Sequence, residues 1–350
     1  MRMLRSQFSL SHLPILSSGW RFATLATLAM GVAGTACQIG PAPPPTKGPF
    51  PIEGVDQLTS DLAYYRDLSW SPDGNMIAAR KCGIINRQAH CSSTQESLVL
   101  IELDSGVQEE VTVSLEGAQS VGGYPIEWSG DGRNLILAIG KLASSGESSI
   151  QFHTYSYGSY SLSSNEFSEL PAEQFPIGWS QSSMEILVEL IGADGTFSLG
   201  WLDLQIQILT DLPLQPPSGG FLGPLILSPD DRTLLESDSH LPESCSEIRV
   251  GALESQEDLL PFLSLACFPA WSHDGSKLAY AAKDQPRSTP NQIMIANSDG
   301  SDPRPLFPDR PVGDLGFPTW SPDGTRIAFT AGPNGGNAIY IADVPREVRP

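Results

Sequence analysis

One five-residue phrase recurs along the chain and constrains its fold more than any other feature. Residues 70–74 and 320–324 both read Trp-Ser-Pro-Asp-Gly, and residues 128–132 and 271–275 each differ from that phrase at one position. Two more divergent copies stand at residues 179–183 and 227–231. The serines of successive copies are 58, 51, 48, 44 and 49 residues apart. A period of about 40–50 residues is typical of propellers and solenoids.

The phrase has the composition of a tight turn between two strands. Proline restricts φ, aspartate can accept hydrogen bonds from the backbone two residues on, and glycine adopts positive φ at little cost. The tryptophan is expected to end the preceding strand and to pack against a neighbouring sheet. A calcium loop would need oxygen ligands at alternating positions, and these do not recur. An aliphatic residue stands six positions after each serine and marks the next strand: Ile77, Leu135, Ile186, Leu234, Leu278 and Ile327.

Further apolar segments predict four strands in each repeat. In the first repeat they cover residues 97–103 and 107–113, and in the fifth residues 292–296 and 304–306. Four strands make one propeller blade. Residues 51–350 are therefore predicted to form an all-β, six-bladed propeller of four-stranded antiparallel blades. The last repeat is one strand short, and an N-terminal strand at residues 55–59 is predicted to supply it and close the ring.

These repeats resemble the WD-like repeat of the TolB C-terminal domain, a six-bladed β-propeller. The resemblance rests on the phrases and on an aromatic-proline pair before four of them: Tyr124-Pro125, Phe175-Pro176, Phe268-Pro269 and Phe317-Pro318. It covers nearly all of the chain after residue 50. The TolB family carries an additional α/β domain before its propeller, whereas a short proline-rich stretch stands there in this chain. We therefore expect a TolB-like fold in a different role.

Residues 1–36 have the layout of a secretory signal peptide. They contain three arginines and no acidic residue, and the run over residues 22–36 is uncharged. A basic start, a short apolar core and small residues at the end are typical of an export signal. The run is shorter than the roughly 20 residues that a membrane-spanning helix needs.

Residues 34–37, Gly-Thr-Ala-Cys, resemble the lipobox of bacterial lipoproteins. The resemblance implies that Cys37 is acylated and becomes the first mature residue. Gly34 departs from the family, which prefers an aliphatic residue there. A lipoprotein is favoured over a plain secreted protein or an uncleaved anchor. Residues 37–50 are rich in proline and are predicted to form an extended tether.

The other four cysteines suit an oxidising compartment outside the cytoplasm. Cys82 and Cys91 bracket one loop of the first blade, and Cys245 and Cys267 stand in connections around the fourth. These connections are expected to emerge on one face of the propeller. We therefore expect the pairs 82–91 and 245–267, although four cysteines allow three connectivities.

The charge balance disfavours two classes of partner. The chain has 20 basic and 40 acidic residues. Nucleic-acid binding depends on cationic neutralisation of phosphates, so no nucleic-acid partner is predicted. Direct adsorption to anionic lipid is disfavoured for the same reason, and membrane association is expected through the lipid anchor only.

No catalytic motif appears in the sequence. It has no Gly-x-Ser-x-Gly elbow, no phosphate-binding glycine loop and no Cys-x-x-Cys pair, and its five histidines are scattered. No catalytic residue, metal ligand or cofactor is predicted. The sequence favours a lipid-anchored binding module at the periplasmic or outer face of the cell envelope, with an envelope protein or a small extracellular ligand as partner. The alternatives are an exported glycan or lactone hydrolase or lyase with a metal or carboxylate site in the channel, and a structural component of an envelope assembly.

Recognition is expected on the face that carries the longer loops, because loops on a rigid scaffold commonly bind. The phrases are expected to lie on the opposite face, away from a ligand. Arg87 and His90 stand on the loop between Cys82 and Cys91. For the tyrosines the alternative role is packing between blades. The candidate contact residues are Tyr64, Tyr65, Arg66, Arg87, His90 and Tyr124.

Overall fold

The chain from residue 54 onward is built almost entirely of β-strands. The computed structural model describes residues 54–350 except 62, 84–95, 112–117, 122–125, 145–150, 172–173, 193, 207, 213–223, 239–244, 256–258, 287, 309–313 and 333–337. All of them belong to the compact unit Pro45–Pro350. The predicted signal peptide and tether lie outside the described residues. In the part of the chain that the structure describes, no helix has the length and apolar character needed to cross a bilayer.

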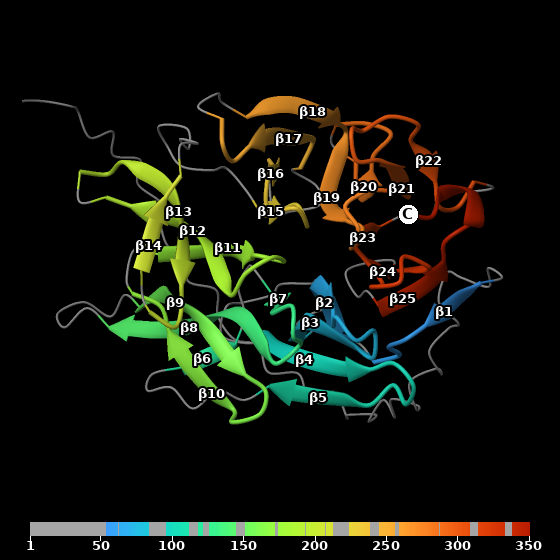
Figure 1. Ribbon diagram of the computed structural model, residues 1–350. Helices are drawn as coiled ribbons and strands as arrows, with labels where there is room; N and C mark the ends of the chain where they lie inside the picture. The colour runs from blue at the N-terminus through green and yellow to red at the C-terminus, as the bar shows by residue number, and fades with distance from the viewer. Residues whose placement is uncertain are drawn as a thin grey trace, which may run out of the picture. The chain divides into compact units, whose positions relative to one another are not determined.

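The described strands form six antiparallel sheets, one for each copy of the phrase, and we number these blades in chain order (Figure 1). Blade 1 contains β2 (Ala63–Trp70), β3 (Met76–Gly83), β4 (Glu96–Glu102) and β5 (Gln108–Val111). Blade 2 contains β6 (Ala118–Val121), β7 (Glu127–Trp128), β8 (Asn134–Ser144), β9 (Gln151–Ser161) and β10 (Glu166–Glu169). Blade 3 contains β11 (Gln174–Trp179), β12 (Glu185–Ile191), β13 (Phe197–Asp203) and β14 (Ile208–Asp211). In blade 2 both β6 and β7 pair with β8, so the innermost strand is in two pieces.

Blade 4 contains β15 (Leu225–Leu227), β16 (Thr233–Ser237), β17 (Glu247–Ala252) and β18 (Leu260–Ser264). Blade 5 contains β19 (Ala266–Trp271), β20 (Lys277–Ala282), β21 (Gln292–Asn297) and β22 (Arg304–Pro305). Blade 6 contains β23 (Leu315–Trp320), β24 (Arg326–Ala331) and β25 (Ala338–Asp343), joined by β1 (Val55–Gln57). A short 3₁₀ helix, η1 (Arg346–Val348), follows.

Contacts between neighbouring sheets close these blades into a ring. β2 contacts β7 of blade 2, β7 contacts β11, β11 contacts β15, and β16 contacts β19. β19 contacts β23, and β23 returns to β2. The sequence prediction of a six-bladed propeller is therefore confirmed.

The predicted N-terminal closing strand is also confirmed. β1 pairs with β25, with Val55 opposite Ala342 and Gln57 opposite Tyr340. Beyond β1, the buried Thr59 hydroxyl accepts a hydrogen bond of 2.9 Å from the Ile339 N–H. The first and last segments of the propeller thus share one sheet, which leaves the ring without an open seam between them.

Five of the six phrases form a turn that is fastened by their own serine and aspartate. In the first copy, the buried Ser71 hydroxyl donates to Asp73 Oδ1 at 2.6 Å and accepts from the Met76 N–H at 2.9 Å. The Asn75 N–H donates to the same Asp73 oxygen at 3.1 Å, and Gly74 has a φ of 77°. The serine hydroxyl donates in the same way to Asp131, Asp230, Asp274 and Asp323 in other copies. Its hydrogen bond is the largest cause of the lowered pKa of Asp73, Asp131 and Asp323.

The strand after each turn runs into the core as predicted. The tryptophans end the inner strands β2, β7, β11, β19 and β23. The aliphatic residues six positions after the serines are all fully buried: Ile77, Leu135, Ile186, Leu234, Leu278 and Ile327.

The two divergent copies compensate for one another. Blade 3 has Ser182 where other copies have aspartate, and blade 4 has Asp231 where other copies have glycine. Asp231 reaches across to blade 3, where it accepts hydrogen bonds from the Ser180 hydroxyl at 2.7 Å and the Ser182 hydroxyl at 2.6 Å. It also accepts bonds from the Gln181 N–H at 3.1 Å and the Ser182 N–H at 3.2 Å. The aspartate missing from one turn is thus supplied by the next blade.

One predicted disulfide is present. Cys245 and Cys267 are bonded, with Cα atoms 5.6 Å apart, and both are fully buried. They connect the segment before β17 with β19, so the bond ties blade 4 to blade 5. Cys82, in β3, is also disulfide-bonded. Cys91, its predicted partner, lies outside the described residues, so the 82–91 pair stays a prediction.

The compensation between blades 3 and 4 predicts the behaviour of one substitution. Asp231→Gly restores the phrase in blade 4 and relieves a non-glycine φ of 59°, yet it removes four hydrogen bonds from the blade 3 turn. We expect a net loss of about 1–3 kcal/mol in the free energy of unfolding, measured by chemical denaturation. Adding Ser182→Asp should recover most of that loss. An Asp231→Gly protein as stable as the wild type would contradict the compensation.

Candidate functional site

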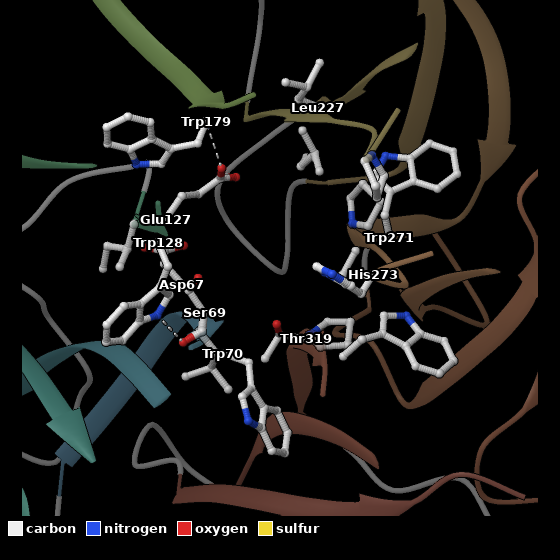
Figure 2. A pocket seen from close by; sticks show the side chains of 18 of the residues that line it. Asp67, Ser69, Trp70, Glu127, Trp128, Trp179, Leu227, Trp271, His273 and Thr319 are labelled. Atoms are coloured by element: carbon white, nitrogen blue, oxygen red, sulfur yellow. Dashed lines mark hydrogen bonds between the residues drawn. The ribbon is translucent and has the colours of Figure 1, made fainter. Parts of the chain in front are cut away.

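A cavity of about 250 Å³ lies where the six phrases meet (Figure 2). The residue that opens each phrase lines it: Trp70, Trp128, Trp179, Leu227, Trp271 and Trp320. The residue two positions later lines it as well: Pro72, Gly130, Gln181, Pro229, His273 and Pro322. Because every blade contributes equivalent residues, the cavity lies at the centre of the ring.

The phrases therefore border a cavity, whereas the prediction from sequence put them away from any ligand. The reason is their place in each blade. Each phrase follows the innermost strand, so its first residues stand at the inner edge of the ring, while in the first copy the aspartate accepts hydrogen bonds within the turn. Within one phrase, the serine and aspartate hold the turn, whereas the first and third residues line the cavity.

Bulged inner strands shape part of the wall. Asp67, Phe268 and Phe317 each precede the phrase tryptophan by three residues and have φ values of 52°, 52° and 49°. Each lies in an irregularity of the pairing between the inner strand and the next one. The rings of Phe268 and Phe317 stack with centroids 4.2 Å apart. In blade 1 the equivalent residue is Asp67, so a carboxylate stands where blades 5 and 6 have a phenyl ring.

Glu127 places an ionisable carboxyl in the cavity. It directly precedes Trp128 and is partly exposed. Its Oε2 accepts a long hydrogen bond of 3.4 Å from the backbone N–H of Trp179. A Cβ built on Gly178 would lie 2.8 Å from the same oxygen. The glycine in blade 3 therefore makes room for the carboxyl of blade 2. Burial raises the pKa of Glu127 from its usual 4.5 to about 7, against the opposing effect of the Trp179 N–H.

Asp67 also lines the cavity, but its charge is compensated. Its carboxylate pairs with Arg80, whose Nη1 lies 3.4 Å from Glu96 Oε2, and Glu96 in turn pairs with Arg66. The chain of ion pairs contains two acidic and two basic side chains. Glu127 takes part in no ion pair within the described part of the chain.

His273 faces the cavity from blade 5, across from Glu127 (Figure 2). It is exposed and replaces the proline of the phrase. Ser69 and Thr319 add hydroxyl groups to the wall. Among the described residues, no group of three or more histidine, cysteine, aspartate or glutamate side chains is arranged to hold a metal ion.

The predicted contact residues lie elsewhere or outside the described part. Tyr65 is fully buried, and its hydroxyl donates to Asp61 Oδ1 at 2.7 Å and lies 3.1 Å from Gln108 Oε1. It offers no surface to a ligand and has the packing role that was the alternative for the tyrosines. Tyr64 is partly exposed opposite Cys82, and Arg66 is engaged with Glu96. None of these three lines the cavity. Arg87, His90, Tyr124 and Cys37 lie outside the described residues.

Sequence reasoning missed Glu127 and His273, although a signal for both existed. Each departs from its own repeat: the position before the phrase tryptophan is Ser69, Gly178, Ala270 or Thr319 in other copies, and acidic only in blade 2. Only the closed ring shows that these departures face one space.

The raised pKa of Glu127 predicts a pH dependence of stability. Between about pH 4.5 and 7 the folded protein binds more protons than the unfolded chain, so this contribution to stability falls as pH rises through that window. We expect the free energy of unfolding of the wild type, relative to Glu127→Gln, to decrease by about 3 kcal/mol from pH 4.5 to 8. Asp67, Arg80 and His273 also face or adjoin the cavity, but they are common to both proteins. Parallel stability curves would show that Glu127 has an ordinary pKa.

Comparisons with known proteins support the fold. No protein-family model and no curated protein matches the sequence. Among solved structures, a putative TolB from Agrobacterium tumefaciens is 15% identical with a TM-score of 0.52, over 83% of this chain and 97% of that one. TolB from Acinetobacter baumannii is 16% identical with a TM-score of 0.52, over 75% and 59%. An oligogalacturonate lyase from Vibrio parahaemolyticus is 14% identical with a TM-score of 0.51, over 84% and 94%. The chain is thus a TolB-like six-bladed β-propeller in fold.

Proposed function

We propose that this chain is an exported, lipid-anchored binding module of the cell envelope, and that it binds an envelope protein or a small extracellular ligand through the cavity at the phrase end of the ring. One observation carries the choice of site. The cavity has the usual composition of a ligand pocket, with apolar and aromatic walls and a few convergent polar groups. The export signal and the lipobox-like residues support the location.

The volume of the cavity limits what can enter it. At about 250 Å³ it is smaller than the roughly 300–1,000 Å³ of sites for drug-sized ligands. A small molecule or one side chain of a protein partner fits this volume. Four polar side chains can orient the ligand. Glu127 of blade 2 and His273 of blade 5 lie on opposite walls of the cavity. Ser69 of blade 1 and Thr319 of blade 6 line the wall between those two blades.

A second function is favoured by Glu127. A carboxyl with a pKa of about 7 in a cavity suits general acid or base catalysis near neutral pH. An oligogalacturonate lyase shares the fold, so an exported glycan lyase or hydrolase is the alternative. Turnover of oligogalacturonate that is abolished by Glu127→Gln would favour this enzyme over the binding module.

The anchor can be tested at Cys37. Cys37→Ser removes the thiol that acylation requires, so the protein should move from the membrane fraction to the soluble envelope fraction. Thr46→Ala, in the predicted tether, is the matched control and should stay with the membrane. Quantitative fractionation followed by immunoblotting measures both, and unchanged membrane association of the Cys37→Ser protein would contradict lipid anchoring.

The site can be tested at Gly130, which lines the cavity and has open space where a Cβ would stand. Gly130→Phe should fill the cavity mouth without disturbing the turn. Val107→Phe, at a position 60% exposed and away from the cavity, is the control. In-cell crosslinking followed by affinity capture and mass spectrometry should recover a stoichiometric partner or ligand with the wild type and Val107→Phe, and at least tenfold less with Gly130→Phe. Equal recovery with all three proteins would rule out the cavity as the binding site.

A further inference from the structure

We propose that the cavity binds a small organic cation, an ammonium group carried on an apolar body, with Glu127 as its counter-charge. This inference rests on the proposed function and adds the chemical class of the ligand. It depends on the charges that line the cavity, on the polar groups that can reach a guest, and on the shape of the wall beside Glu127.

Among the described residues, acidic side chains line the cavity and no lysine or arginine does. The acidic lining residues are Asp67 and Glu127. Asp67 is already paired with Arg80. Among the described residues, Glu127 accepts a hydrogen bond only from the Trp179 backbone N–H, at 3.4 Å, which is beyond the usual 2.7–3.2 Å of an N–H···O hydrogen bond. The carboxylate therefore lacks the compensation that a buried charge ordinarily has.

The indole N–H groups of the lining tryptophans do not supply donors that would favour an anion over a cation. The Trp128 indole N–H donates to the Ser69 carbonyl oxygen at 3.1 Å. The indole nitrogens of the other four lining tryptophans are buried, without a partner in the described part of the chain: Trp70, Trp179, Trp271 and Trp320. Since these nitrogens have no accessible surface, they cannot meet a ligand in this conformation. An anion would face the Glu127 carboxylate with no lysine or arginine to hold it.

The rest of the wall suits an apolar body attached to the cation. The prolines of three phrases and the stacked pair Phe268 and Phe317 line it with carbon surface. Gly178 leaves the space that the Glu127 carboxyl occupies, so the carboxyl lies within the wall without filling the cavity.

Choline and its neutral isostere 3,3-dimethyl-1-butanol test the charge separately from the shape. Isothermal titration calorimetry at pH 8 should show binding of choline to the wild type, and at least tenfold weaker binding to Glu127→Gln. The neutral alcohol should bind both proteins equally and more weakly than choline binds the wild type. Glu166→Gln, at an exposed position in β10, is the matched control and should bind choline like the wild type.

The pH dependence gives a second readout. Because burial holds the Glu127 pKa near 7, choline should bind more tightly at pH 8 than at pH 6, and this gain should be lost in Glu127→Gln. His273 and Asp67 also line the cavity, Arg80 pairs with Asp67, and all three remain in the variant. A gain that persists in Glu127→Gln would overturn the role of Glu127.

Two further results would overturn the proposal, and they differ in what else they contradict. Equal affinity for choline and the alcohol in the wild type would leave the cavity as a binding site but remove the preference for a cation. If neither probe binds, the preference for a cation is wrong. The Gly130→Phe capture experiment then still decides whether the cavity binds a partner of another class.

Discussion

The fold depends on a buried serine hydroxyl that holds the two sides of the turn together in five of the six blades. In the first copy, Ser71 donates to Asp73 and accepts from the Met76 N–H, at 2.6 and 2.9 Å. This pair of bonds fixes where the inner strand ends and where the second strand begins, because both strands are attached to the same oxygen. It also sets the direction of the residue after the serine, which lines the cavity at the centre of the ring, and of the tryptophan, whose indole ring points away from the cavity (Figure 2). Repetition of one small polar contact thereby places equivalent side chains from every blade around one cavity.

Departures from the repeat carry the specific features of this propeller. Asp231 and Ser182 depart together, and the blades that contain them exchange a structural role. His273 and Glu127 depart singly and face the cavity. A position that keeps the phrase is explained by the turn, whereas a position that loses it either has a partner in the next blade or presents new chemistry at the centre. Glu127 stands directly before the phrase and presents a carboxyl at the centre, where Gly178 in the next blade leaves room for it.

Much of the fold could be predicted because its signals are local. The phrase marks the strand ends, the aliphatic residue after it marks the core, and the missing strand of the last repeat indicated the closing role of β1. The pair Cys245 and Cys267 followed from the places of these residues in consecutive blades. The cavity could not be predicted in the same way. Glu127 and Gly178 are 51 residues apart, and their contact depends on how adjacent blades are rotated about the ring axis, which no local pattern gives. The role of Tyr65 could not be predicted either, because an aromatic residue in the sequence can pack between blades or contact a ligand.

Glu127 forms no ion pair within the described part of the chain, and we propose that it binds a cation in the cavity. Its titration, followed by the ¹³C shift of the side-chain carboxyl in the labelled protein, tests this most directly. The structure predicts a pKa of about 7 in the free protein and a lower value with choline bound, because a nearby cation favours the ionised form. A pKa near 4.5 that choline leaves unchanged would contradict it.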